Sequence, residues 1–181
     1  MEKMDKEKLL FHICCAPDAT VVAERLHPDY DITGFFYNPN IHPESEYKLR
    51  VKEMEDLAKK INLKLIVGPY DSDNWFEQVE GLEHEPEGGA RCVVCFKMRL
   101  EQTARVAKEQ GFDIFTTVLT VSPHKNADLI NDIGEEIAEK YGVAFMAANF
   151  KKKDGFKRSL VLSKQYNLYR QNYCGCIYSK R

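Results

Sequence analysis

Six cysteines occur in three close pairs, and this pairing constrains the chain more than any other feature of its sequence. The pairs are Cys14-Cys15, Cys92-Val-Val-Cys95 and Cys174-Gly-Cys176. Each pair adjoins glycine, alanine or proline, small or turn-forming residues that let the chain bend. Because the pairs are spread over the whole chain, we expect the fold to bring them to one place. Four thiolates can hold an iron–sulfur cluster or a zinc ion, and two thiols then remain for another role.

Three simpler roles for the cysteines fit less well. A disulfide framework is typical of small secreted domains, whereas this chain has 181 residues and a charged start that is not expected to act as a secretory signal. A structural zinc site usually uses two CxxC knuckles, and only one pair has that spacing. Six unrelated buried cysteines would not be expected to fall into pairs. We therefore favour an iron–sulfur cluster.

The composition predicts one globular domain, residues 1–181, in a reducing cytoplasm. Apolar residues make up 44 % of the chain, which is ordinary for a globular protein. No apolar run approaches the roughly 18 residues that a membrane-spanning helix needs, and unpaired thiols suit a reducing compartment. We expect residues 80–90, which are rich in glutamate, proline and glycine, to form a loop or lid. Residues 151–181 are expected to form a C-terminal helical extension.

Charge is distributed unevenly along the chain. The net charge is −2, and acidic residues dominate residues 71–87. A basic cluster lies near the C-terminus and comprises Lys151, Lys152, Lys153, Lys157 and Arg158. Such a cluster is most often a solvated loop. Its position just before the last cysteine pair also suggests contact with phosphate groups.

Apolar runs alternate with helical patterns along the chain. The expected strands are residues 9–14, 32–37, 63–67, 112–119 and 143–147. The expected helices are residues 16–26, 44–61, 75–79, 92–110, 126–141 and 156–171. This alternation predicts an α/β fold with a mainly parallel sheet and helices on both of its faces.

Polar segments follow several of the predicted strands. Cys14-Cys15 follows the first strand, residues 38–40 follow the second, and residues 122–124 follow the fourth. In parallel sheets, active sites gather at the carboxyl ends of the strands, near the point where the strand order reverses. We therefore expect the first cysteine pair to lie at the functional site.

The first pair opens a predicted helix, and the N-terminus of a helix favours the thiolate form of cysteine. Asp18 lies about one helical turn further on, so its carboxylate can face the same space or simply offset the helix dipole. Three histidines lie near predicted strands. We expect His12 to pack in the core, while His42 and His124 could reach the site but more often would belong to surface loops.

The second and third pairs each admit two roles. Cys92 and Cys95 open a helix and either ligate a cluster or form a redox pair of the thioredoxin type, and we favour ligation. A disulfide between Cys174 and Cys176 would close a small, strained ring that is easily reduced. The alternative for this pair is metal binding.

Together with these pairs, longer motifs cover almost the entire chain. They are Cys14-Cys15-Ala-Pro-Asp18, Phe36-Tyr-Asn-Pro-Asn-Ile-His-Pro43 with Glu46-Tyr47 and Arg50, Arg91-Cys92-Val-Val-Cys95-Phe-Lys-Met-Arg99-Leu100, Leu119-Thr-Val-Ser-Pro-His124-Lys125, and Tyr173-Cys-Gly-Cys176. This set resembles the epoxyqueuosine reductases of the QueH family.

The resemblance implies reduction of epoxyqueuosine in tRNA to queuosine by an iron–sulfur enzyme that does not use cobalamin. It also implies a nucleotide-hydrolase-like, Rossmann-like α/β fold. The expected partners are tRNA carrying epoxyqueuosine and an unidentified electron donor. Removal of the epoxide oxygen takes two electrons and two protons, whereas a [4Fe–4S] cluster normally passes one electron at a time. We therefore expect a second redox element beside the cluster.

Two divisions of the six cysteines stay open. The preferred one uses the first two pairs as cluster ligands, namely Cys14, Cys15, Cys92 and Cys95. It leaves Cys174 and Cys176 as a catalytic redox pair, with Asp18 as a third catalytic residue. The other division draws the cluster ligands from all three pairs, and the remaining thiols with Asp18 then hold an additional iron ion.

Two rival functions also stay open. One is a cluster-dependent tRNA thiolation enzyme of similar fold, which would need a glycine- or serine-rich phosphate loop after the first strand. Cys14-Cys15-Ala-Pro is not such a loop. The other is a zinc-stabilised RNA-binding module without catalytic activity.

Overall fold

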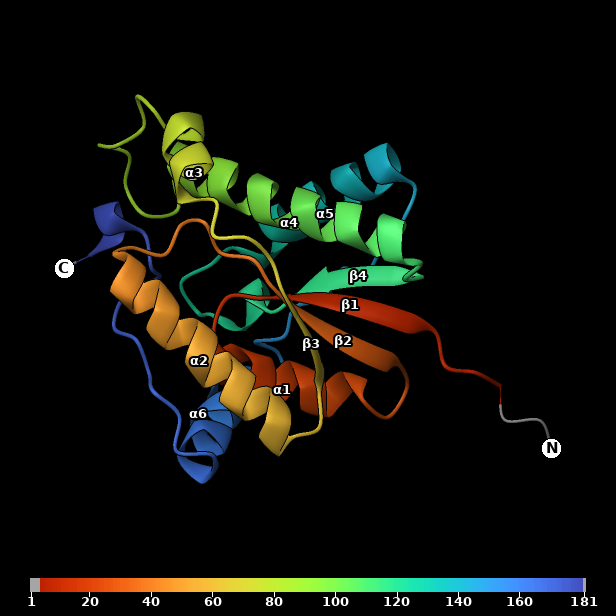
Figure 1. The fold of residues 1–181 in the computed structure, drawn as a ribbon. Coiled ribbons are helices and arrows are strands. Elements are labelled where there is room, and N and C mark those ends of the chain that lie inside the picture. Colours follow the sequence, from red (N-terminus) through yellow and green to blue (C-terminus); the bar gives the residue numbers. More distant parts are fainter. Residues whose placement is uncertain (1–3, 181) are drawn as a thin grey trace.

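The computed structural model describes residues 4–180, which contain a five-stranded, fully parallel sheet (Figure 1). Its strands are β1 (Lys8–Ile13), β2 (Asp31–Phe36), β3 (Lys64–Val67), β4 (Ile114–Thr117) and β5 (Ala144–Phe145). The strand order is β3-β2-β1-β4-β5, so β1 lies at the centre. The predicted parallel α/β sheet is confirmed.

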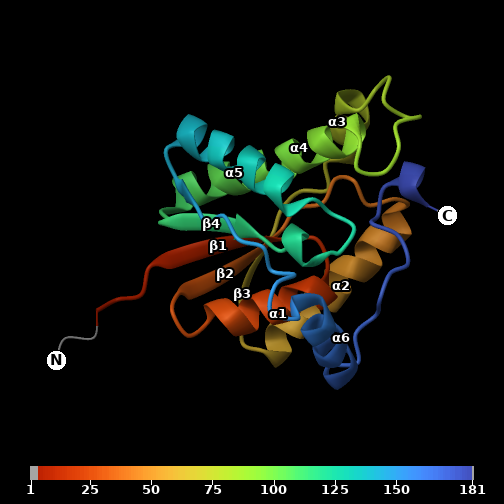
Figure 2. The same cartoon turned by 180° about the vertical axis from the view of Figure 1, so that it is seen from behind.

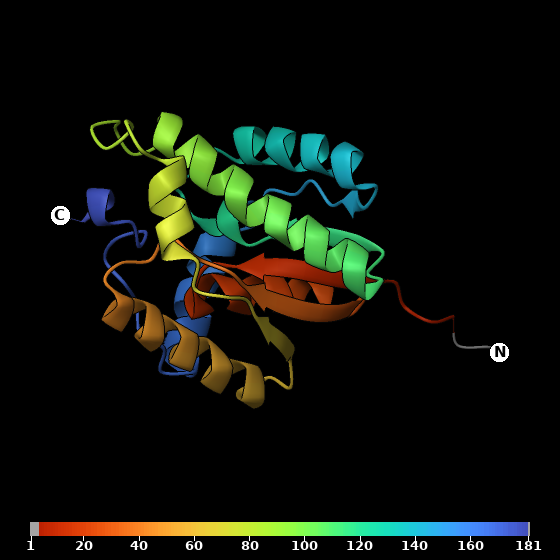
Figure 3. The same cartoon turned by 45° about the horizontal axis from the view of Figure 1, so that its top comes forward.

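Helices cover both faces of the sheet, as expected (Figures 1 and 2). They are α1 (Ala16–Leu26), α2 (Glu44–Lys60), α3 (Ser72–Gln78), α4 (Ala90–Gln110), α5 (Ala127–Tyr141) and α6 (Gly155–Gln165), with short 3-10 helices η1 (Leu119–Val121) and η2 (Ile177–Ser179). Figure 3 shows α4 and α5 side by side over one face. Helices α1, α2 and α6 lie on the other. No helix within residues 4–180 is both long and apolar enough to cross a bilayer.

The central strand β1 supplies side chains to both layers of the core. Leu9, Phe11 and Ile13 pack with the residues of α1 and α2, whereas Leu10 packs with those of α4 and α5. This division follows from the alternation of side chains along a strand. His12 is fully buried in the same strand. Its two ring nitrogens lie 3.0 Å from a hydroxyl and a carbonyl oxygen, and burial lowers its pKa to about 3. The expected core histidine is thus confirmed.

The strand order reverses between β1 and β4. The chain leaves β1 through α1 to build β2 and β3 on one side, and then crosses through α4 to build β4 on the other side. The carboxyl ends of β1 and β4 therefore border the crevice where ligands bind in such sheets. Residues 166–180 run past this same edge, from the layer of α6 to the layer of α3 (Figures 1 and 2).

Three predicted elements are shorter in the structure than in the sequence pattern by three or more residues. The last helix, predicted over residues 156–171, ends at Gln165 because Asn167 adopts a left-handed φ of 53° and the N–H of Leu168 turns back to the Ser163 carbonyl at 2.8 Å. The predicted helical extension is therefore helical only in its first part. Strand β4 ends at Thr117, where the chain turns into η1. Strand β5 pairs with β4 over only two residues.

Residues 80–89 of the segment predicted as a loop form a loop, residue 90 begins α4, and Arg91 holds the loop against the start of that helix. Its Nη1 donates to the carbonyl oxygens of Leu82 at 3.0 Å and Glu85 at 2.7 Å. Movement of this loop as a lid stays a prediction. Residues 1–3 and 181, which belong to the predicted single domain 1–181, lie outside the described residues.

Candidate functional site

Two of the cysteine pairs line one small cavity, here called the inner cavity, at the carboxyl edge of the sheet. Cys92 and Cys95 come from the first turns of α4, and Cys174 and Cys176 come from the C-terminal segment. The cavity has a volume of about 50 Å³. All six cysteines are free thiols, so the disulfide considered for Cys174 and Cys176 is not formed in this structure.

Local backbone geometry presents the CxxC pair to this cavity. Gly88 has a φ of 86°, a conformation that glycine adopts without steric cost. Its N–H donates to Cys92 Sγ at 3.2 Å. Cys95 and Cys176 are buried, and loss of hydration raises the pKa of both thiols. These two thiols therefore need a metal ion or a nearby cation to become thiolates.

The remaining pair forms a compact group with Asp18, here called the N-terminal triad. Cys15 caps α1 and Asp18 lies in its first turn, so both side chains and Cys14 gather at the helix start. Cys14 Sγ lies 3.8 Å from Cys15 Sγ and 3.7 Å from Asp18 Oδ2. The ligand atoms of all three lie within 4.8 Å of one another. The hydrogen bond between the two thiols lowers the pKa of Cys14 and raises that of Cys15, while burial raises the pKa of Asp18.

A second cavity, the outer cavity, adjoins the first. It has a volume of about 250 Å³, and its lining includes Cys14 and Asp18. Cys174, Arg99 and Lys125 line both cavities. Cys14 and Asp18 of the N-terminal triad therefore face one space, while Cys15 is buried behind them. The remaining two pairs line the neighbouring space, and Cys174 lines both.

Two basic side chains lie between the thiols. Arg99 is 4 % exposed and donates from Nε to the Cys95 carbonyl at 3.4 Å, whereas Lys125 is half-buried. Loss of hydration disfavours the charge of both, yet nearby thiolates, among them that of Cys14, raise the pKa of Arg99 and of Lys125. Neither forms a salt bridge with a carboxylate in residues 4–180. A cation removed from water is costly unless an anion compensates it, so these two favour thiolates or a thiolate-bound metal centre beside them.

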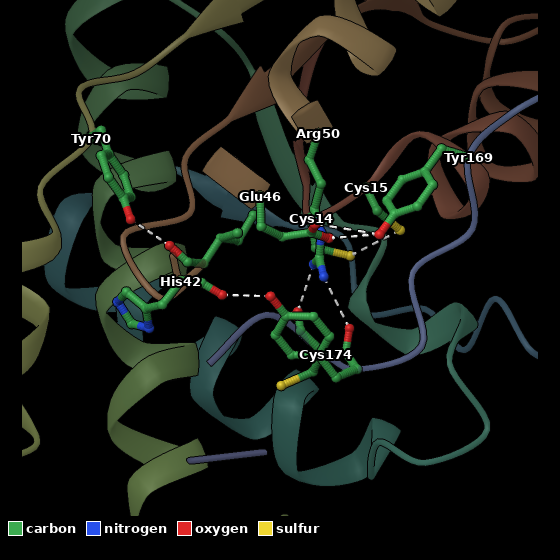
Figure 4. A network of polar contacts seen from close by, with 10 residues as sticks. Cys14, Cys15, His42, Glu46, Arg50, Tyr70, Tyr169 and Cys174 are labelled. Carbon is green, nitrogen blue, oxygen red and sulfur yellow. Dashed lines mark hydrogen bonds and ion pairs between the residues drawn. The ribbon is translucent and has the colours of Figure 1, made fainter. Parts of the chain in front are cut away.

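Arg50 holds the C-terminal segment in place (Figure 4). Its side chain is 2 % exposed. Nη1 donates to the Cys174 carbonyl at 2.9 Å and Nη2 to the Tyr173 carbonyl at 3.0 Å. Nε pairs with Glu46 at 2.9 Å, and the Tyr169 hydroxyl donates to the same carboxylate at 3.1 Å. A helix and an irregular segment more than 120 residues apart are thus joined through one guanidinium.

His42 secures the same segment from the other side. Its N–H donates to the Gly175 carbonyl at 2.8 Å, and its Nδ1 accepts from the Ile177 N–H at 3.2 Å. A Cβ on Gly175 would lie 3.1 Å from Arg50 Nη1, so glycine suits the close approach at this position. His42 is 5 % exposed beneath Trp75, and burial lowers its pKa to about 4. The expectation that His42 belongs to a surface loop is therefore wrong, because aromatic packing covers it.

Comparison with known proteins relates this site to a family. The family model for epoxyqueuosine reductase QueH matches residues 9–181. The chain belongs to the epoxyqueuosine reductase QueH family. The QueH protein of Acinetobacter baylyi is 46 % identical over 177 residues, which cover 97 % of this chain and 81 % of that protein. The QueH protein of Streptococcus pyogenes is 42 % identical over 182 residues, which cover 97 % and 71 %.

Solved structures of two different proteins share the fold of this chain. The U34-tRNA thiolase NcsA from Methanococcus maripaludis, solved with its [4Fe–4S] cluster, matches with a TM-score of 0.60 at 14 % identity over 98 % of this chain and 62 % of the thiolase. A predicted tRNA methyltransferase subunit from Methanocaldococcus jannaschii matches with a TM-score of 0.60 at 17 % identity, over 87 % and 74 %. At such identities the likeness concerns the fold alone, and it agrees with the predicted nucleotide-hydrolase-like class.

The structure places the predicted site residues around the two cavities, except Cys15, which is buried next to Cys14 and Asp18. Sequence patterns assign no role to three further residues, Arg50, Arg99 and Lys125, although all three stand within the motifs that carry the family resemblance. Spacing contained a signal for Arg99: it follows Cys95 by four residues on a helix, so both lie on one face. Arg50 gave no such signal, because its partners lie far away in the sequence. His124 is exposed, as expected, and lines both cavities.

Replacing Arg50 with methionine is expected to loosen the segment that carries Cys174. The variant keeps the bulk of the side chain but loses two hydrogen bonds to backbone carbonyls and leaves Glu46 without its cation. Since hydrogen bonds to charged groups contribute about 1.5–3 kcal/mol each, we expect fast amide exchange across residues 173–177 and at least a tenfold loss of activity. Hydrogen exchange read by mass spectrometry measures the first effect. Lys48→Met, on an exposed pair with Glu44 of the same helix, is the control, and equal exchange in both variants would contradict the assignment.

Proposed function

We propose that this chain carries out the reaction for which its family is named, the reduction of epoxyqueuosine in tRNA to queuosine, at the carboxyl edge of its sheet. The proposal rests on the meeting of five cysteines, at least one from each pair, around two adjoining cavities beside two basic side chains. The substrate loses its epoxide oxygen as water and becomes an alkene, which takes two electrons and two protons. The site therefore needs a redox-active group and a proton donor next to the substrate.

The inner cavity suits a [4Fe–4S] cluster. Its four thiols match the usual number of thiolate ligands, and they are Cys92, Cys95, Cys174 and Cys176. A cluster held by four thiolates is anionic, which supplies the counter-charge that Arg99 lacks. Trp75 Nε1 and Arg91 Nε are buried without a hydrogen-bond partner in residues 4–180, and both residues line this cavity. Hydrogen bonds to sulfur are a common feature of such sites. When bound, the cluster supplies electrons one at a time.

The N-terminal triad suits an additional iron ion. Two thiols and a carboxylate form a mixed sulfur and oxygen ligand set that iron accepts. Cys14 is expected to lose its proton before Cys15 does, because its hydrogen bond with Cys15 lowers the pKa of Cys14. Asp18 lines the outer cavity, so the triad borders the space that would receive the substrate. A bound iron ion supplies Lewis acidity toward an oxygen atom there.

Lys125 is placed to donate a proton to the epoxide oxygen as that oxygen leaves. It lines the outer cavity together with Cys14 and Asp18, and nearby thiolates raise its pKa, which keeps its side chain protonated despite burial. Its Nζ can donate a hydrogen bond to the epoxide oxygen and release a proton as the C–O bond breaks. Exclusion of bulk water from a half-buried cavity strengthens this interaction.

The division of cysteines preferred from the sequence stays a second arrangement. In it, Cys14 and Cys15 join the CxxC pair as cluster ligands, while Cys174 and Cys176 act as a two-electron dithiol. The free thiols of the C-terminal pair suit that role. The arrangement of the cavities favours the first assignment, because Cys174 and Cys176 line the same space as Cys92 and Cys95.

Mass spectrometry of the reacted tRNA tests the function directly. Protein purified and reconstituted without oxygen is incubated with tRNA carrying epoxyqueuosine and a chemical reductant, and the nucleosides are then analysed. Loss of one oxygen atom from the modified nucleoside is the expected result. Incorporation of sulfur would support the thiolation alternative. An unchanged nucleoside after incubation with protein that holds an intact cluster would contradict the proposed reductase function.

The basic cluster is expected to contribute to tRNA binding through only part of its residues. Arg25 donates to the carbonyl oxygens of Phe150, Lys152 and Lys153, which fixes the loop that precedes α6. Arg158 is engaged in a salt bridge with Glu24 at 2.6 Å. Lys152 and Lys153 are exposed and form no salt bridge within residues 4–180, so their ammonium groups are free to meet phosphates.

Changing both Lys152 and Lys153 to glutamine should therefore weaken tRNA binding and reduce its salt dependence. Because each lost phosphate contact lowers the slope of log K against log salt by about 1, we expect the slope to fall by up to about 2. The double variant Lys59→Gln and Lys108→Gln removes the same charge from exposed positions in the last turns of α2 and α4 and should keep the wild-type slope. Equal slopes in the two double variants would place the RNA elsewhere.

A further inference from the structure

The outer cavity extends from the N-terminal triad to two residues that the proposed reaction does not use, Phe156 and Arg170. Arg170 is exposed, whereas Phe156, Cys14 and Asp18 are half-buried. Arg170 therefore lies at the mouth of the cavity, and Phe156 lies next to it.

The size of this cavity limits what it can enclose. Pockets that bury a whole drug-sized ligand occupy about 300–1,000 Å³, and the outer cavity has about 250 Å³. It suits the small ring that bears the epoxide, but the nucleobase, which remains joined to the tRNA, would have to stay at the mouth. The residues at the mouth are then the ones that meet the base.

Phe156 and Arg170 pack against each other at the mouth of the outer cavity and form a platform there. The Arg170 guanidinium carbon lies 5.9 Å from the centroid of the Phe156 ring. Arg170 Nη1 also donates to Ser163 Oγ at 3.3 Å, which anchors the side chain to α6. Phe156 is the second residue of α6 and follows Gly155, where an added Cβ would lie 1.7 Å from the Phe150 carbonyl oxygen. The start of α6 therefore packs tightly against the loop that precedes it, which carries Lys152 and Lys153.

We propose that Phe156 and Arg170 bind the face of the substrate nucleobase, so that the epoxide-bearing ring reaches Cys14 and Asp18. Aromatic rings and guanidinium planes are the groups on which proteins stack bases splayed out of RNA. Lys153 precedes Phe156 by three residues, so a phosphate contact and a base contact would lie on adjacent parts of one rigid segment. This inference rests on the proposed function and identifies where its nucleotide substrate sits.

Four variants at the platform test this placement. Phe156→Leu keeps apolar volume but removes the ring, and Phe156→Tyr restores a ring. Arg170→Gln removes the charged guanidinium, and Arg170→Lys restores the charge without the plane. Phe112→Leu changes a half-buried phenylalanine beside the amino end of β4 and is the matched control. KM and kcat are measured for tRNA carrying epoxyqueuosine and for the free epoxyqueuosine nucleoside.

Phe156→Leu is expected to raise KM about tenfold or more for both substrates, since stacking of one base is worth roughly 1–3 kcal/mol. Phe156→Tyr should retain the wild-type KM. Arg170→Gln should raise KM, and Arg170→Lys should raise it to a similar extent. Phe156→Leu should leave the salt slope of tRNA binding unchanged. As a readout independent of turnover, an RNA stem-loop with 2-aminopurine at the wobble position should lose fluorescence on binding to wild type and to Phe156→Tyr, but not to Phe156→Leu.

Two outcomes separate failure of this inference from failure of the proposed function. Wild-type kinetics and quenching in Phe156→Leu, in a protein that reduces the substrate, would overturn the platform alone. Absence of oxygen loss with wild-type protein would refute the function, whatever the variants show. An effect of Phe156→Leu on tRNA but not on the free nucleoside would also contradict base stacking and would reassign Phe156 to the RNA backbone surface.

Discussion

Replacing Cys92 or Cys95 with alanine is expected to remove both the iron–sulfur absorbance and the reductase activity. Both arrangements of the cysteines place these two thiols on the cluster, and the structure places them at the start of one helix beside the buried Arg99. Loss of one of four thiolates leaves an open iron site and an incomplete counter-charge for that cation. We expect less than about one hundredth of wild-type activity, since the electron source itself is lost.

Absorbance near roughly 400 nm, a range expected of thiolate-bound clusters, measures this result after anaerobic reconstitution, together with iron and acid-labile sulfide content. A suitable control is Val93→Ala, which lies between the two cysteines but contributes no ligand. Its spectrum should match that of wild type. A full cluster in both cysteine variants would show that the CxxC pair does not ligate it. It would also contradict the proposal that the inner cavity holds the cluster.

Two double variants are expected to give opposite metal contents. On the arrangement that the cavities favour, changing Cys174 and Cys176 to serine removes half of the cluster ligands, so iron and sulfide should both fall steeply. Changing Cys14 and Cys15 to serine should instead remove about one iron per chain and leave sulfide constant, because a single iron ion carries no inorganic sulfide. Neither variant should reduce epoxyqueuosine, since each lacks one of the two redox elements.

The alternative arrangement reverses this pattern. If Cys14 and Cys15 are cluster ligands, their removal should abolish sulfide. Removal of Cys174 and Cys176 should then stop the reaction while iron and sulfide stay near wild-type values. Parallel analysis of both double variants therefore distinguishes the arrangement that the cavities favour from the division preferred from the sequence. Full activity without the C-terminal pair would defeat both of them.

Local sequence patterns were sufficient for the fold class and for one part of the site. Apolar runs of strand length alternate with helical periodicity, and only a sheet covered on both faces buries such a set. Because the carboxyl ends of parallel strands share one edge, the position of Cys14-Cys15 after β1 already predicted a site there. Asp18 could be joined to that pair because it lies about one helical turn past it, in the first turn of the predicted helix. The structure confirms this local arrangement.

Only the tertiary structure decided which space the C-terminal pair enters. Residues 166–180 contain little regular structure, so no periodicity reports their path. Their course depends on contacts with Arg50 and His42, which lie more than 120 residues earlier. The same reason accounts for the burial of Arg99 and the partial burial of Lys125, which no pattern predicted: a basic residue is usually exposed, and these are covered by segments from distant parts of the chain. Local sequence patterns thus determined the sheet and the position of its first cysteine pair, while long-range contacts determined the cavities. The reason is that the burial of a residue depends on the whole folded chain, whereas periodicity depends only on residues close in the sequence.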